Sequence, residues 1–122
     1  MDSPDSFWDY LENLVVSSPL KIDRPKGARH PRYPEMIYPL DYGFLAGTLA
    51  ADGGGIDVWL GTSGSRDLCG VILTVDLHKR DSEIKILLGC TGQEIQTILD
   101  FHNNNSMRAH LVLRPKPSGE KI

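Results

Sequence analysis

The chain has 122 residues, of which 40% are hydrophobic and 24% charged, with a formal net charge of −3. This length predicts one domain, spanning 1–122, and the composition is that of an ordinary globular protein. The balance of charge provides no broad basic face for nucleic acid, no apolar run approaches the ~20 residues of a membrane helix, and two cysteines are too few for a disulfide scaffold. We therefore expect a cytoplasmic protein with neither nucleic-acid nor membrane partners.

The first predicted element is an amphipathic helix within residues 1–17, running from about Asp5 to Val16. Its apolar side chains follow the spacing of a single buried helical face, with Phe7, Leu11, Leu14 and Val15. Residues 17–19, Ser-Ser-Pro, then end the helix.

The stretch from Leu20 to Gly55 is predicted to be irregular, because four prolines interrupt any strand ladder. These prolines are Pro25, Pro31, Pro34 and Pro39. Basic and phenolic side chains share the segment, namely Lys26, Arg29, His30, Arg32, Tyr33, Tyr38 and Tyr42. They suit an anion-binding lining, although composition alone favours a solvated basic loop at least equally.

The second half reads as strands with one helix. Strand-like runs occupy 56–60, 71–77, 84–88 and 109–113, and the charged turn 78–82 predicts a hairpin. Thr91 and Glu94 form a capping box that begins a helix ending at 103–105, with His102 on its apolar face as a packed histidine. Residues 115–122 are polar and are predicted to form a flexible tail. This order of elements indicates an α+β fold with a small bent or closed sheet.

Two carboxylates flank a glycine turn in the segment Asp52-Gly53-Gly54-Gly55-Ile56-Asp57-Val58. Asp52 and Asp57 converging from such a turn would suit Mg²⁺, which takes few protein oxygens and keeps its waters. Taken alone, an aspartate-capped turn is the better interpretation of Asp52.

A second acidic group brackets the predicted hairpin, with Asp76, Asp81 and Glu83 preceding Lys85. Glu83 and Lys85 are two residues apart on a strand and so face the same way. A metal-binding carboxylate beside a phosphate-binding ammonium is one interpretation. An exposed cross-strand ladder of charges is the simpler one.

Taken in order, these segments resemble the soluble family I inorganic pyrophosphatases. The resemblance runs from about Ile22 to His102, and its most specific part is the block from Tyr38 to Val58. The matching stretches are Ile22-Asp23-Arg24-Pro25-Lys26-Gly27-Ala28-Arg29, Tyr38-Pro39-Leu40-Asp41-Tyr42-Gly43-Phe44 with Gly47-Thr48-Leu49, the Asp52–Val58 turn, and the acidic hairpin up to Lys85.

The resemblance implies a small five-stranded OB-like β-barrel with flanking helices, possible homo-oligomers, and hydrolysis of pyrophosphate by metal-activated water. It implies Mg²⁺, or Mn²⁺, as the cofactor. The implied catalytic residues are Asp52, Asp57, Tyr42 and Lys85, and the implied substrate-binding residues are Lys26, Arg29, Arg32 and Tyr38. The implied metal ligands are Asp52, Asp57 and Glu83, with Asp76 and Asp81 for further ions.

The chain also departs from the family pattern. Gly54 replaces the aspartate that orients or deprotonates the attacking water in the family, and Gly55 replaces the proline that follows it. A hairpin that carries a phosphate-binding arginine is missing, and His102-Asn103 stands where the family has Tyr-Lys. An alternative function is therefore a catalytically weakened metal- or phosphate-binding module, or a regulatory one.

Overall fold

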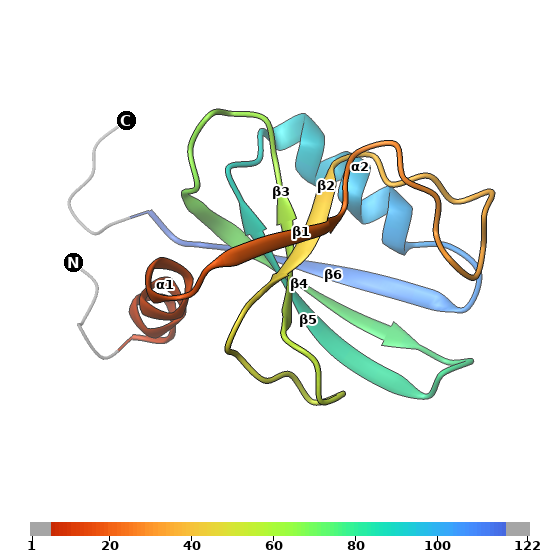
Figure 1. The fold of residues 1–122 in the computed structure, drawn as a ribbon, viewed down its shortest axis with the longest axis horizontal. Helices are drawn as coiled ribbons and strands as arrows, with labels where there is room; N and C mark the ends of the chain where they lie inside the picture. The colour runs from red at the N-terminus through yellow and green to blue at the C-terminus, as the bar shows by residue number, and fades with distance from the viewer. Residues whose placement is uncertain (1–5, 117–122) are drawn as a thin grey trace.

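A six-stranded mixed sheet carries one helix on each face in the computed structural model, which describes residues 6–116 (Figure 1). In chain order the elements are α1 (Phe7–Ser17), β1 (Leu20–Arg24), β2 (Asp41–Leu45), β3 (Ile56–Leu60), β4 (Leu68–Asp76), β5 (Asp81–Leu88), α2 (Gly92–His102) and β6 (Met107–Leu113). The α+β class predicted from the sequence is confirmed.

The strands lie in the order β1-β2-β3-β5-β4-β6. Neighbouring strands are antiparallel except β3 and β5, which run parallel. The prediction of a five-stranded barrel is wrong in both count and closure, because the sheet has six strands and β1 and β6 lie at opposite edges.

The two strands that the sequence analysis assigned to irregular chain are β1 and β2. Pro19 and Pro25 lie just outside the ends of β1, so they bound this edge strand and do not interrupt it. In β2, Gly43 allows the backbones of β1 and β2 to approach closely, because a Cβ at this position would lie 1.8 Å from the carbonyl oxygen of Lys21.

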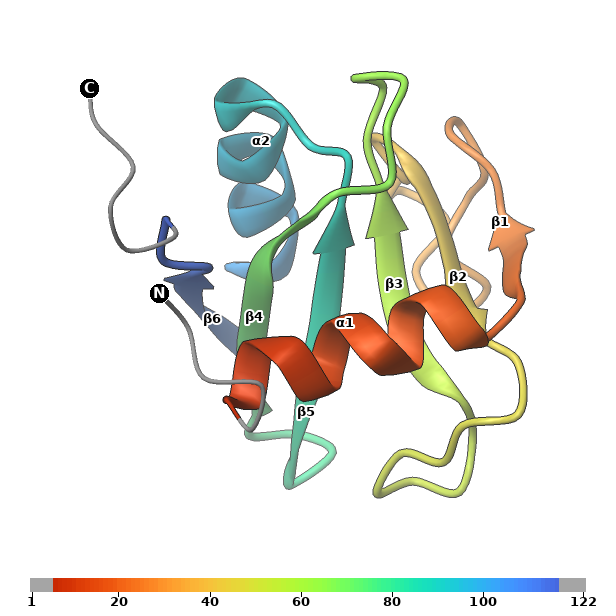
Figure 2. The ribbon, with the colours of Figure 1, turned by 90° about the vertical axis from the view of Figure 1, so that its left-hand side faces the viewer.

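Helix α1 crosses one face of the sheet (Figure 2). Ser6 is its N-cap and accepts a 3.1 Å hydrogen bond from the backbone N–H of Asp9, whereas the predicted start at Asp5 lies outside the described residues. Leu11 is buried, with Trp8 and Val15 beside it, and Phe7 is 57% exposed. The face in contact with the sheet is thus rotated slightly from the predicted one.

Each face of the sheet has its own core, because side chains alternate along the strands. Beneath α1 lie Leu45, Val58, Val71, Ile86 and Leu88. On the other face Ile95 and Ile98 of α2 pack against Tyr42, Trp59, Ile72 and Leu87. This second face continues past the end of α2, where it carries polar groups.

Helix α2 begins as predicted. The hydroxyl of Thr91 accepts from the backbone N–H of Glu94 at 3.2 Å, and the Glu94 carboxylate accepts from the backbone N–H of Thr91 at 2.9 Å. Glu94 also accepts from Thr62, which ties α2 to the loop after β3. Among residues 6–116 no helix is long and apolar enough to span a bilayer. The predicted tail lies mostly outside the described residues.

Candidate functional site

A cleft of about 870 Å³ opens on the sheet face beyond the last turn of α2. Its floor is formed by β2, β3, β4 and β5. Its sides come from residues 23–38, from the β4–β5 turn and from residues 101–107. The cleft therefore gathers segments from most of the chain length.

The parallel ladder between β3 and β5 sets the floor of the cleft. Asp57 is the register partner of Lys85, so the two side chains leave the same face from neighbouring strands. Glu83 precedes Lys85 by two residues on β5 and shares that face. Tyr42, the register partner of Trp59, reaches the same place from β2.

The ammonium of Lys85 is the centre of this floor. Its Nζ donates to Tyr42 Oη at 2.7 Å, to Asp57 Oδ2 at 3.0 Å and to Glu83 Oε1 at 3.0 Å. Lys85 is 4% exposed. Burial acts to lower the pKa of Lys85, but the adjacent Tyr42 oxygen and the Asp57 carboxylate outweigh it and the pKa is raised. Burial raises the pKa of Tyr42, so this hydroxyl keeps its proton at neutral pH.

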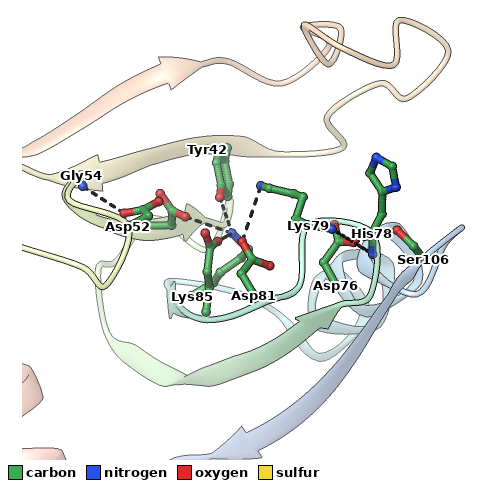
Figure 3. A network of polar contacts seen from close by, with 11 residues as sticks. Tyr42, Asp52, Gly54, Asp76, His78, Lys79, Asp81, Lys85 and Ser106 are labelled. Carbon is green, nitrogen blue, oxygen red and sulfur yellow. Dashed lines mark hydrogen bonds and ion pairs between the residues drawn. The ribbon is translucent and has the colours of Figure 1, made fainter.

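A second polar group surrounds Asp76 at the end of β4 (Figure 3). Its Oδ1 accepts from the backbone N–H of His78 at 2.9 Å, the N–H of Lys79 at 3.2 Å and the hydroxyl of Ser106 at 2.7 Å. The Ser106 bond is the main reason that the pKa of Asp76 is lowered. Asp76 thus holds the β4–β5 turn against the segment that precedes β6.

Asp52 lies in the loop that precedes β3. Its Oδ1 accepts from the backbone N–H of Gly54 at 2.9 Å, which is the aspartate-capped turn expected from the sequence. Asp52 also lines the cleft together with Asp57.

His102 lies beneath the cleft at the end of α2. The indole N–H of Trp59 donates to His102 Nε2 at 2.9 Å. Burial, with a smaller contribution from Lys85, lowers the pKa of His102 to about 3. The ring is neutral at physiological pH, and its proton is on Nδ1 because Nε2 is an acceptor.

The charges that line the cleft nearly cancel. Five carboxylates face four basic side chains, with Asp23, Asp52, Asp57, Asp76 and Glu83 against Arg24, Arg32, Lys79 and Lys85. Within residues 6–116, no three His, Cys, Asp or Glu side chains gather closely enough to hold a metal ion. The protein alone therefore provides no net positive charge for a polyanion.

Comparison with solved structures identifies the fold, whereas comparison with known sequences does not. No family model and no curated protein sequence matches. A crystal structure of an inorganic pyrophosphatase from Neisseria gonorrhoeae superposes with a TM-score of 0.52 and 21% identity, over 75% of this chain and 71% of that one. The chain has an inorganic pyrophosphatase fold.

Two further solved structures are similar at lower scores. An inorganic phosphatase from Anaplasma phagocytophilum gives a TM-score of 0.48 and 18% identity, over 79% of this chain and 74% of that one. An inorganic pyrophosphatase from Coxiella burnetii gives a TM-score of 0.47 and 19% identity, over 75% of this chain and 74% of that one.

The pyrophosphatase fold brings together eight of the site residues expected from the sequence. These are Arg32, Tyr38, Tyr42, Asp52, Asp57, Asp76, Glu83 and Lys85, all of which line the cleft. The other three do not line the cleft, although Asp81 lies at its border beside the lining residue Lys79. Lys26 borders a smaller hollow near Thr62, Arg29 donates to the carbonyl of Pro34 at 3.0 Å, and Asp81 lies 3.8 Å from Lys79.

Several cleft residues were not predicted to belong to the site. Arg24 ends β1 and donates to the hydroxyl of Tyr38. Lys79 reaches the cleft from the β4–β5 turn, and Ser106 from the segment before β6. Arg24 lay inside the matching segment 22–29 and so could be found from the sequence. Ser106 follows the last helix and belongs to no recognised sequence motif, so only the structure assigns it to the cleft.

Proposed function

We propose that this chain hydrolyses inorganic pyrophosphate, or a closely related phosphoanhydride, in a reaction that depends on Mg²⁺. The observation that carries the proposal is the buried Lys85 ammonium, which Asp57, Glu83 and Tyr42 hold at the floor of the cleft. Such a fixed cation, together with a neutral phenol, suits the charged oxygens of a phosphoryl group.

The chain's own residues would bind and orient the substrate. Lys85 supplies its charge at the floor, since its three N–H bonds go to Tyr42, Asp57 and Glu83. Arg24 and Lys79 reach in from the sides. Because these groups are held before substrate arrives, they stabilise charge that develops on the phosphoryl oxygens without having to reorganise. None of the described cleft residues is a serine or cysteine in a nucleophile-elbow context, which favours attack by water.

The donor set fits Mg²⁺ in chemical type. Asp52, Asp57 and Glu83 present carboxylate oxygens to one cleft, and Mg²⁺ is usually held by one or two carboxylates together with substrate phosphates. Lys85 already pairs with two of the three, so we infer that the ion binds well only together with substrate. When bound, Mg²⁺ would offset phosphate charge and favour ionisation of water.

The test is phosphate release from pyrophosphate by the purified full chain, with about 5 mM Mg²⁺ and with EDTA. We expect turnover above about 1 s⁻¹ that EDTA abolishes. Asp57→Asn should lower turnover at least about 100-fold, and it should also lower the melting temperature because it removes a carboxylate that pairs with the buried Lys85. Asp67→Asn, at an exposed carboxylate outside the cleft, is the matched control. Full activity in Asp57→Asn would refute the assignment.

A second function is favoured by the glycine at position 54. A pyrophosphatase-like chain that lacks this carboxylate, and that shows no preformed three-ligand group among residues 6–116, would be a metal- or phosphate-binding module with little turnover. In that case pyrophosphate with Mg²⁺ would raise the melting temperature although no phosphate is released. The same two measurements therefore separate the two functions.

A further inference from the structure

The cleft is much larger than an inorganic diphosphate. Its volume of about 870 Å³ falls in the range of sites that enclose drug-sized organic ligands, about 300–1,000 Å³. A diphosphate is two linked phosphoryl groups and would occupy only the part over Lys85. The remaining space is available to another part of a larger substrate.

The lining of that remaining space differs in chemistry from the floor. Beside the charged strand residues lies a wall of aromatic and thioether side chains, namely His30, Tyr33, Met36, Tyr38 and Phe101. Phosphate oxygens gain nothing from such a wall, because placing charge against apolar atoms costs hydration. A flat organic group, in contrast, gains both buried area and stacking.

The wall is rigid before any ligand arrives. The His30 ring stacks on Tyr38 with an interplanar angle of 8° and a centroid distance of 6.1 Å. Tyr33 lies against the His30 ring at 5.2 Å. His30 Nδ1 accepts from the backbone N–H groups of Arg32, at 3.0 Å, and Tyr33, at 3.2 Å. Tyr33 itself is 38% exposed, so part of its side chain is accessible from the cleft.

Polar groups that suit the edge of a base lie nearby. Asn104 and Asn105 follow α2 and line the same cleft. Their side-chain amides make no hydrogen bond to residues 6–116 of the chain. An amide offers both a donor and an acceptor, which is the combination that nucleobase edges present in return.

We propose that the preferred substrate is a nucleoside di- or triphosphate, whose base stacks against Tyr33 and His30 while its phosphates lie over Lys85. The inference rests on the proposed hydrolase function for the phosphate end of the site. Stacking a base on an aromatic side chain strengthens binding by about 5- to 150-fold. A nucleotide should therefore bind more tightly than the diphosphate group alone.

The experiment measures binding by calorimetry with Mg²⁺ and three hydrolysis-resistant probes: methylenediphosphonate, α,β-methylene-ADP and an alkyl ester of methylenediphosphonate. We expect α,β-methylene-ADP to bind at least about 10-fold more tightly than the other two. Tyr33→Ala should remove that advantage and Tyr33→Phe should keep it. Tyr10→Ala, on the exposed face of α1, is the control.

Each other outcome contradicts the inference. Equal affinity for the nucleotide and methylenediphosphonate, or an unchanged advantage in Tyr33→Ala, would overturn the base site. An alkyl ester as tight as the nucleotide would show a general apolar subsite and no base site. Pyrophosphate hydrolysis with equal probe affinities would refute this inference alone, whereas no binding and no hydrolysis would refute the proposed function as well.

Discussion

The indole N–H of Trp59 donates to Nε2 of His102 over 2.9 Å, and this bond joins the C-terminal part of β3 to the last turn of α2. Both residues are buried, at 0% and 6% exposure. The bond requires an unprotonated Nε2, so the folded state opposes protonation of the ring. The site floor and the helix that borders it are therefore linked through a group that titrates in the unfolded chain.

We expect the protein to lose stability as the pH falls below about 6.5. The folded pKa of His102, about 3, lies under its ordinary value of 6.5, so the unfolded state binds the proton first and stability rises with pH between these values. The slope from this group is about 1.4 kcal/mol per pH unit. Urea unfolding at pH 5 and pH 7 measures it.

His102→Gln provides the comparison, because its side-chain oxygen can still accept from the indole but does not titrate. Its stability should fall less between pH 7 and pH 5 than that of the wild type. Burial also lowers the pKa of His30, which contributes with the same sign in both proteins and cancels in the difference. Equal slopes would show that His102 is protonated normally in the fold.

Lys85→Met should strongly lower turnover and at the same time create a better site for free Mg²⁺. The substitution removes the ammonium that lies 3.0 Å from both Asp57 Oδ2 and Glu83 Oε1, and two unpaired carboxylates then attract a cation. We expect a loss of activity of about 100-fold or more and a larger rise in melting temperature with Mg²⁺ than in the wild type. Lys21→Met, at an exposed position of the edge strand β1, should show neither effect.

Gly54→Asp should raise turnover by about 100-fold if the chain lacks only a positioned base. A Cβ at this position meets only Asp52 Oδ1, at 3.5 Å, so the loop has room for the side chain. Gly54→Asn has nearly the same shape without the charge and serves as the control. No gain in Gly54→Asp would indicate that the loop holds position 54 away from the attacking water.

Asp76→Ala should lower the melting temperature by roughly 5–10 °C, because the β4–β5 turn loses three hydrogen bonds to Oδ1. Asp76→Asn retains an acceptor oxygen and should recover most of the loss. Activity as a function of Mg²⁺ concentration tests the metal role: a much higher Mg²⁺ requirement in Asp76→Asn would show that the carboxylate binds metal and does not only hold the turn.

Local patterns in the sequence predicted the elements that depend on local chemistry. The Thr91–Glu94 box is complete within four residues, and the run 56–60 is bounded by glycines, so α2 and β3 appear where they were predicted. The strands β1 and β2 depend on each other across 16 intervening residues, 25–40, which no short pattern reveals. The five-stranded barrel was implied by the family resemblance and did not follow from the predicted strands.

The candidate site residues that lie on strands could be predicted from the sequence. Asp57, Glu83 and Lys85 alternate correctly on their strands, but their meeting depends on the parallel register between β3 and β5. The parallel direction follows from the path of the chain. After β3 the chain forms β4 on the far side of β5, and it then turns back to form β5 between β3 and β4. Most of the aromatic wall comes from residues 30–38, a segment without regular structure, so the position of that part relative to the floor could not be predicted from the sequence.

The parallel pairing of β3 with β5 also bears on how the chain folds. Lys85 is 28 residues from Asp57 and 43 from Tyr42, whereas the β4–β5 hairpin closes over a short turn. Non-local pairs require more loop-closure entropy before they yield any contact energy. The hairpin is therefore expected to form first and to dock on β3 afterwards, so the cleft floor is acquired late, and a newly synthesised chain has no binding capacity until β5 has emerged.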